Sequence, residues 1–536
     1  MSDPTRLLLF GFDAAAGDLI RRWVEEGELP VLERLIRDGA AAPLGSTAGF
    51  LPESIWASLT TGCQPAGHGI YNWRETRLGT YVRGRRPISP AVPTFWEVLR
   101  NGGAPLGEAP RALLLDVHGA AGTTDPGITF VTGWGLRGAA PHEKDALPPG
   151  EVERVVDSHG AYAANLNREV GGRPLLERAR LRTLERMATR RADVLADLME
   201  RHPWEVCGTI FFESHYAGHA FHQYAKRDAY LEPVPRGRGL DDAMLRVYRA
   251  VDASIGRLID IAPPGTHVAV VSGMGMRPNT NGLTLLPRAL EALGYTVPAT
   301  ASPAARRRER MRRVALAAVP RPLARAVRRR VLDPQALDRH AEQLWTESTD
   351  WSRTRAWAEA EQGSGWIRLN VEGREPAGIV RRGREYDDLC AEIAADLLEL
   401  REVRSGLPAI DEVIHRSELT SGPHEEALPD LLIKWSSDAV VRRAHHPRIG
   451  IVEDSGEDWQ VSEHDDDGWL VLNGPLVRTG ARAAEAYVED LTPTLLHLMG
   501  GVVPDHVDGR VLTELLEPET GRVRYASDGI SDEAAV

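Results

Sequence analysis

Short apolar runs that end in, or directly before, a polar residue are the feature of this chain that most constrains its fold. Such runs lie at residues 6–13, 111–116, 207–212 and 267–272. Amphipathic stretches typical of helices follow or separate them, at residues 17–38, 175–200 and 241–260. This alternation predicts an α/β protein in which helices sandwich a mostly parallel central sheet. Residues just after the runs would then line one edge of the sheet, where α/β proteins bind ligands.

The 536 residues are enough for a large α/β core with insertions. We expect the core to span residues 1–300 and 421–516, with an Arg-rich helical insertion at 301–355, a small α+β subdomain at 356–420 and a flexible tail at 517–536. The basic insertion fits a lid over an anionic substrate or a membrane-surface patch. A solvated helix face is the commoner explanation of such charge.

Composition excludes some classes of partner. The formal net charge of −13 at pH 7 opposes nucleic-acid binding. No apolar run reaches the roughly 20 residues that a membrane helix needs, and the N-terminus has no secretory signal pattern. We therefore expect a cytoplasmic protein without a membrane partner. Cys63, Cys207 and Cys390 are scattered singly, and we expect them to be buried thiols.

Two histidines near the middle of the chain have the spacing of a helical metal site. His215 and His219 are four residues apart, so in a helix both imidazoles project from one side. The alternative is that these rings pack in a core with aromatic neighbours such as Tyr216. Glu213 favours the metal site, because a buried carboxylate is costly unless a cation or hydrogen bonds satisfy it.

Two further candidate ligands are ambiguous when each is taken alone. Asp13 follows a strand-like run, where an aspartate often only caps the next helix. His464 lies in a polar loop beside three aspartates, which bind a hard cation or are simply solvated. If these segments converge at the sheet edge, they form a divalent-metal site. The predicted ligands are then Asp13, Glu213, His215, His219 and His464.

Ser54 is the candidate catalytic residue. Pro52 can begin a helix, which leaves the Ser54 hydroxyl in the first turn. Free N–H groups and the helix dipole favour an anion there, so a nucleophilic hydroxyl would be well placed. The alternative is that Ser54 only caps the helix, and the sequence favours neither.

Four motifs carry a resemblance to a known superfamily. They are Gly11-Phe-Asp13, Thr61-Gly-Cys-Gln-Pro-Ala-Gly-His-Gly-Ile70, Glu213-Ser-His-Tyr-Ala-Gly-His219 and Asp490-Leu-Thr-Pro-Thr-Leu-Leu-His-Leu-Met-Gly500. From about Arg6 to Leu516 the chain resembles the alkaline phosphatase superfamily, specifically its type I phosphodiesterase and nucleotide pyrophosphatase-like branch. The resemblance implies two zinc-like ions and a threonine or serine that attacks phosphorus. One ion would take His215, His219 and His464, and the other would take Asp13 and the nucleophile.

This chain departs from the superfamily pattern around the second ion. The usual nucleophile position falls on Pro52, which has no hydroxyl, so Ser54 would have to take over. Gly273 and Met274 stand where the resemblance implies an aspartate and a histidine, and neither can replace them as ligands. We therefore expect one divalent ion per chain, zinc with manganese or iron as alternatives.

Three functions fit these residues. The first, favoured by the resemblance, is a metal-dependent hydrolase of a phosphate, phosphonate or sulfate ester that acts on a small anionic substrate. The second is a mononuclear metalloenzyme redirected to a lyase, transferase or redox reaction. The third is a degenerate member of the superfamily that binds a ligand or partner without turnover, which Pro52 and Gly273 would both permit.

Overall fold

An eight-stranded sheet forms the centre of the molecule. The computed structural model describes residues 5–46, 52–72, 74–85, 89–103, 109–135, 144–163, 166, 173–230, 234, 239–299, 346–361, 364–454 and 460–529. The strands, in order across the sheet, are β2 (Ala40–Leu44), β19 (Gly468–Asn473), β9 (His267–Ser272), β1 (Leu7–Phe12), β8 (Val206–Phe211), β5 (Ala112–Leu115), β6 (Ile128–Thr132) and β7 (Asp145–Leu147). The run from β9 to β6 is parallel, and β19 and β7 are antiparallel to their neighbours. The predicted mostly parallel sheet is confirmed.

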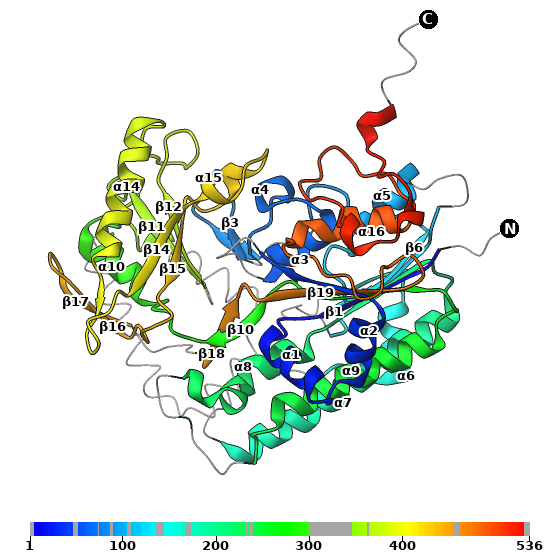
Figure 1. Cartoon of the computed structure of the whole chain (residues 1–536). Helices are drawn as coiled ribbons and strands as arrows, with labels where there is room; N and C mark the ends of the chain where they lie inside the picture. Colours follow the sequence, from blue (N-terminus) through cyan, green and yellow to red (C-terminus); the bar gives the residue numbers. More distant parts are fainter. Residues whose placement is uncertain are drawn as a thin grey trace, which may run out of the picture.

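Helices cover both faces of this sheet (Figure 1). On one side lie α1 (Gly17–Glu25), α2 (Pro30–Asp38), α6 (Glu151–His159), α7 (Pro174–Arg201) and α9 (Ala243–Ile261), and on the other lie α3 (Pro52–Thr61), α5 (Phe95–Val98) and α16 (Leu491–Leu498). Every residue of β1, β8 and β9 is buried as a result. This explains why these strands are continuous apolar runs without alternation.

The stretch predicted as one helix at residues 17–38 is two helices. Helix α1 ends at Glu25, and α2 begins at Pro30. Gly27 between them has φ of 74°, a left-handed conformation that favours glycine and ends a helix. Pro30 is tolerated at the first position of α2 because it needs no N–H partner there.

A second apolar core lies beside the main one and is larger than predicted. It is built on the antiparallel strands β11 (Ala356–Glu361), β12 (Ser364–Leu369), β15 (Leu431–Trp435) and β14 (Ile410–His415), with α10 (Leu285–Leu293), α14 (Arg384–Leu398), β16 (Arg443–His446) and β17 (Gly450–Glu453) packed around them. Because β15 pairs with β12 and β14, the boundary predicted at residue 420 falls inside this unit. Its start is also earlier than residue 356, since α10 contributes Leu285 and Leu286 to the same core.

Two further predictions on organisation concern the Arg-rich insertion and the tail. Most of the predicted Arg-rich insertion, up to residue 345, lies outside the described residues. The tail predicted to be flexible contains the short turns η7 (Pro518–Thr520) and η8 (Ala526–Gly529), and Ala526 donates to the Val503 carbonyl at 3.0 Å. The three cysteines are buried and free, as predicted.

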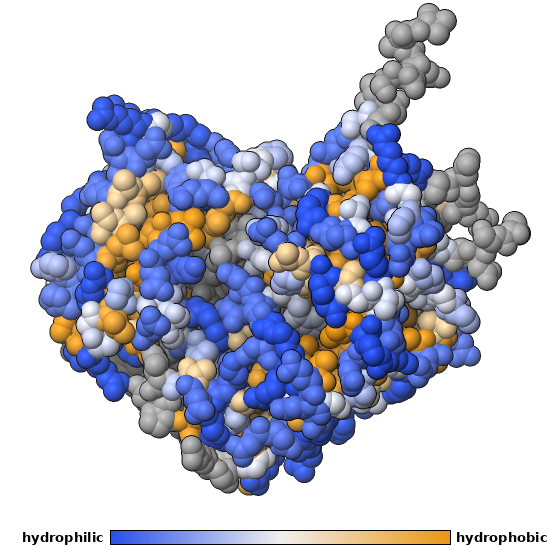
Figure 2. All heavy atoms as spheres, viewed as in Figure 1, coloured by the Kyte–Doolittle hydropathy of each residue, from blue (hydrophilic) through white to orange (hydrophobic). Residues whose placement is uncertain are grey.

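The exposed face in Figure 2 is mainly hydrophilic, with apolar patches scattered over it. Among the described helices, none has the length and apolar character needed to cross a bilayer.

Candidate metal centre

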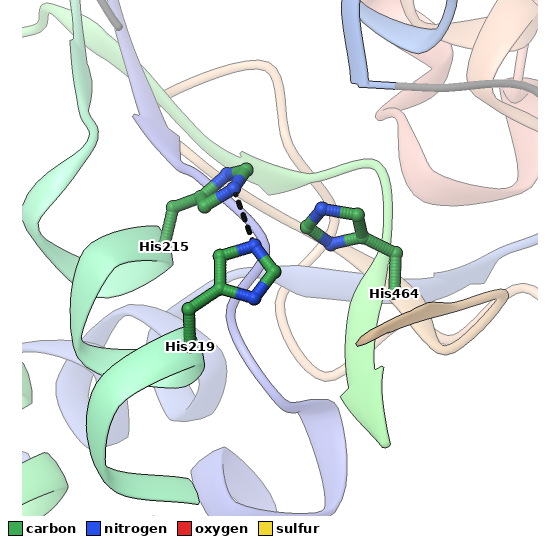
Figure 3. Close-up of side chains that lie close together, drawn as sticks. All are labelled: His215, His219 and His464. Carbon is green, nitrogen blue, oxygen red and sulfur yellow. Dashed lines mark hydrogen bonds between the residues drawn. The ribbon is translucent and has the colours of Figure 1, made fainter. Parts of the chain in front are cut away.

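Three histidines from distant parts of the chain meet at one point. His215 and His219 come from α8 (Glu213–Ala225), and His464 comes from β18 (Ser462–Asp465). The rings point toward a common space in Figure 3, with centroids 4.7 to 5.0 Å apart. Their potential ligand atoms all lie within 4.8 Å of one another. The predicted convergence of these residues is therefore present in the structure.

Two connections bring helix α8 and strand β18 together. Strand β18 pairs with β10 (Gly275–Pro278), which directly follows the central strand β9, and this pairing places His464 opposite Met276. The Ser462 hydroxyl donates to the Gly218 carbonyl on α8 at 2.9 Å. Strand β18 is thereby held against the helix that carries the other two histidines.

Hydrogen bonds orient two of the rings toward the centre. His219 Nδ1 lies 3.0 Å from the Ser462 carbonyl, which can only accept, and His215 Nδ1 lies 2.7 Å from the Asp13 carboxylate. A hydrogen on each Nδ1 leaves both Nε2 lone pairs facing inward. These Nε2 atoms are 3.1 Å apart, so either a hydrogen on one of them or a metal cation between them must offset the repulsion of the two lone pairs.

The spacing of His215 and His219 fits two ligands of one transition-metal ion. Zinc–nitrogen bonds of about 2.0–2.1 Å place two neighbouring ligands roughly 3.0–3.4 Å apart. The 3.1 Å separation of His215 Nε2 and His219 Nε2 lies in that range. Among the described residues, His215, His219 and His464 are the group of three histidine, cysteine or carboxylate side chains near enough to share an ion, with ligand atoms within 4.8 Å of one another.

Asp13 lies beside the trio. One carboxylate oxygen, Oδ2, is 2.7 Å from His215 Nδ1, and the other, Oδ1, accepts from the Trp56 indole at 2.8 Å. Asp13 follows β1 directly and is buried. The structure therefore places this predicted ligand at Nδ1 of His215, whereas His219 faces the other ring nitrogen, Nε2.

Glu213 has a different partner from the predicted cation. Both of its carboxylate oxygens lie 3.3 Å from Arg191 Nε, and Tyr162 donates its hydroxyl to one of them at 2.7 Å. Arg191 also donates to Asp116 at 2.9 Å. Burial lowers the pKa of Arg191, but the carboxylates of Glu213 and Asp116 raise it more. The guanidinium therefore stays protonated and positively charged. A guanidinium, which the sequence did not reveal as a partner, compensates this buried carboxylate.

Ser54 lies in the first turn of α3, as predicted. It is fully buried, and its Oγ has no hydrogen-bond partner among the described residues. Two residues later, the Trp56 indole donates to Asp13, which contacts His215, so the start of α3 lies close to the three histidines.

Apolar groups fill the space where the superfamily pattern implies further ligands. A Cβ at Gly273 would lie only 2.4 Å from Ile55 Cγ2 and 3.1 Å from Leu59 Cδ1. Met274 is buried, and its carbonyl accepts from the Ser272 hydroxyl at 2.8 Å. The aspartates after His464 have other partners, since Asp466 accepts from Ser46 and Asp467 pairs with Arg21. Among the described residues, the potential metal ligands therefore form one group, His215, His219 and His464.

Comparison with solved structures finds similar chains at low sequence identity. Human ectonucleotide pyrophosphatase/phosphodiesterase 5 is 12% identical, with 96% of this chain and 100% of that chain covered and a TM-score of 0.47. The murine protein is 11% identical over the same shares, with a TM-score of 0.45. Phosphonoacetate hydrolase from Sinorhizobium meliloti 1021, in complex with phosphonoacetate, is 12% identical, with 93% and 95% covered and a TM-score of 0.49.

The curated proteins contain no match to this chain. The family comparison is more informative, because its match covers residues 7–468, which include the three histidines and every strand of the central sheet except β19. It confirms the resemblance seen in the motifs and the expectation of an enzyme that acts on phosphoesters. The chain belongs to the type I phosphodiesterase / nucleotide pyrophosphatase family.

Proposed function

We propose that this chain hydrolyses a small phosphate, phosphonate or sulfate ester with the help of one divalent cation held by His215, His219 and His464. Family membership supports the reaction class. The observation that supports a bound cation is the orientation of His215 Nε2 and His219 Nε2, which face each other 3.1 Å apart. Three neutral imidazoles suit zinc, with iron and manganese as alternatives, although carboxylates suit manganese better.

The proposed stoichiometry is one ion per chain. Two observations support it. The position of Gly273 has no room for a side chain, because Ile55 and Leu59 lie against it. Asp13, which would hold a second ion in the superfamily pattern, uses its two oxygens to accept from Trp56 and His215.

A cation in this position would polarise the ester and stabilise negative charge in the transition state. We assign Ser54 as the nucleophile for this reaction. Its hydroxyl is in the first turn of the ten-residue helix α3, where backbone N–H groups and the helix dipole stabilise an anionic ester. The absence of a hydrogen-bond partner for Ser54 among the described residues is consistent with a hydroxyl kept for substrate.

Metal analysis and an ester panel test the proposal together. Purified protein should contain about one metal per chain, and His219→Ala should lose it. The panel should include a phosphodiester, a phosphomonoester, a phosphonate ester and a sulfate ester. Ser54→Ala should lower hydrolysis by a factor of about 1,000 or more.

Ser58→Ala is the matched control on the same helix. Ser58 is also buried, but its Oγ lies 3.0 Å from His68 Nε2. We expect Ser58→Ala to retain hydrolysis. Two metals per chain would favour the two-ion mechanism that the superfamily resemblance implies. No metal would favour a degenerate family member that binds a ligand or partner without turnover. Bound metal without hydrolysis of any ester would favour the lyase, transferase or redox alternative.

A further inference from the structure

We infer that Asp13 is a positioning residue for His215 and that Trp56 holds Asp13 in this role. The inference rests on the proposed cation site and adds to it the residues that orient one of its ligands. In the superfamily pattern the position of Asp13 would bind a second ion, so the role assigned here differs from the expected one.

The geometry is a chain of three buried side chains. Trp56 Nε1 donates to Asp13 Oδ1 at 2.8 Å, and Asp13 Oδ2 lies 2.7 Å from His215 Nδ1. The exposed fractions of Trp56, Asp13 and His215 are 1%, 2% and 0%. Hydrogen bonds of this length in a dry environment restrict the orientation of the carboxylate and of the imidazole ring.

The chemical consequence concerns the tautomer of His215. A carboxylate accepts, so the hydrogen of a neutral His215 is held on Nδ1. The lone pair of Nε2 then faces His219 Nε2 at 3.1 Å. With the hydrogen on Nε2, His215 would present a donor to the centre and would not bind a cation.

Trp56 connects Asp13 to helix α3 through its indole hydrogen bond. It stands two residues after Ser54, so the hydrogen bond to Asp13 joins the proposed nucleophile's helix to the cation site. The indole also explains the glycine in Gly11-Phe-Asp13. A Cβ at Gly11 would lie 2.4 Å from Trp56 Cη2 and 2.9 Å from Ile210 Cγ1, so any larger residue there would displace the ring.

Cobalt binding to the metal-free full-length chain tests the inference, with affinity measured by chelator competition. In Asp13→Asn the amide has one acceptor oxygen for two donors, Trp56 Nε1–H and His215 Nδ1–H. If the oxygen stays with Trp56, the amide nitrogen faces His215 and favours the wrong tautomer. We expect the affinity for Co²⁺ to fall by about 10–100-fold.

The double variant Trp56→Phe/Asp13→Asn separates positioning from a merely structural effect. Without the indole, the amide oxygen is free to turn to His215 Nδ1, so the double variant should bind Co²⁺ more tightly than Asp13→Asn alone. Asp252→Asn is the control, because Asp252 is a buried carboxylate that accepts two backbone N–H bonds, from Val31 and Leu32. It should leave the affinity for Co²⁺ unchanged.

Several outcomes would overturn the inference. Unchanged Co²⁺ affinity in Asp13→Asn, or no recovery in the double variant, would remove the role of Asp13 and leave the cation site intact. A cobalt absorption spectrum that loses a ligand in Asp13→Asn would make Asp13 a direct ligand. Wild-type protein that binds no Co²⁺ would end both this inference and the proposed function.

A second measurement does not depend on folded variants. Nitrogen NMR of labelled histidines in the metal-free wild type should show the hydrogen of His215 on Nδ1. A hydrogen on Nε2 would contradict the inference directly.

Discussion

Arg191 Nη1 donates to Asp116 Oδ2 at 2.9 Å, and neither side chain has any exposed surface. The same guanidinium lies 3.3 Å from Glu213, the first residue of α8. Asp116 follows β5 and Glu213 follows β8, so one cation from α7 ties two strand ends together at the edge of the sheet. Through Glu213, this arginine contacts the first residue of the helix that carries His215 and His219.

Arg191→Met should therefore lower the free energy of unfolding by about 3–5 kcal/mol, because it leaves two carboxylates buried without a counter-charge. Urea denaturation followed by circular dichroism measures this. Arg257→Met is the control, since Arg257 pairs with Asp193 where both side chains are about half exposed. Its effect should stay within about 0.5 kcal/mol. Equal losses in the two variants would contradict the assigned role of Arg191.

Gly273→Ala should lower the free energy of unfolding by about 1–3 kcal/mol, because the added methyl group overlaps Ile55. The double variant Gly273→Ala/Ile55→Ala should be less destabilised than the sum of its single variants, since truncation of Ile55 makes room for the methyl group. Thermal or urea unfolding of the four proteins measures the coupling. Additive losses would show that Ile55 does not limit the space at position 273.

Removal of the proposed metal should destabilise the protein. An ion that binds only the folded chain and is present at 100 times its dissociation constant adds about 2.7 kcal/mol to stability. Zinc should therefore raise the unfolding midpoint of chelator-treated protein, and His464→Ala should abolish the rise. His445→Ala, which changes an exposed histidine on β16, should keep it. A rise that persists in His464→Ala would place the ion elsewhere.

His222 should make stability depend on pH. Burial lowers the pKa of His222 to about 4, from an ordinary value of 6.5. The unfolded chain then binds this proton more strongly, so stability is lost as the pH falls from about 6.5 to about 4. The loss should approach about 3 kcal/mol at the low end.

His222→Gln removes the titrating group and keeps an acceptor for the Tyr230 hydroxyl, which lies 2.8 Å from His222 Nδ1. The difference in unfolding free energy between the wild type and this variant, measured in urea at several pH values, should shrink or change sign as the pH falls. A difference that is constant from pH 7 to pH 4 would refute the prediction.

The central strands could be predicted because burial on both faces leaves a continuous apolar run. Strand β9 begins and ends where the sequence indicated, and β1 and β8 agree within one residue at each end. The convergence of His215, His219 and His464 followed from the same logic together with the resemblance. Sheet edges collect residues that are far apart in the chain.

Other features could not be predicted, because no pattern in the neighbouring sequence indicates them. Glu213 has a polar partner in Arg191, which lies 22 residues earlier in a helix whose periodicity does not distinguish a buried arginine from an exposed one. The second core extends past residue 420 because β15 pairs with β12, more than 60 residues earlier. The contact between Trp56 and Asp13 is equally non-local. Pairings of this kind depend on tertiary packing, which residue patterns within a segment do not encode.

Strand β19 has a consequence for the order in which the protein matures. It inserts between β2 and β9, and His464 precedes it by only four residues. During synthesis, His215 and His219 leave the ribosome more than 200 residues before this segment does. Binding of the proposed ion by all three histidines therefore requires residue 464, so a nascent or truncated chain that ends before it has no complete site. Metal binding would then occur only after most of the chain has been synthesised.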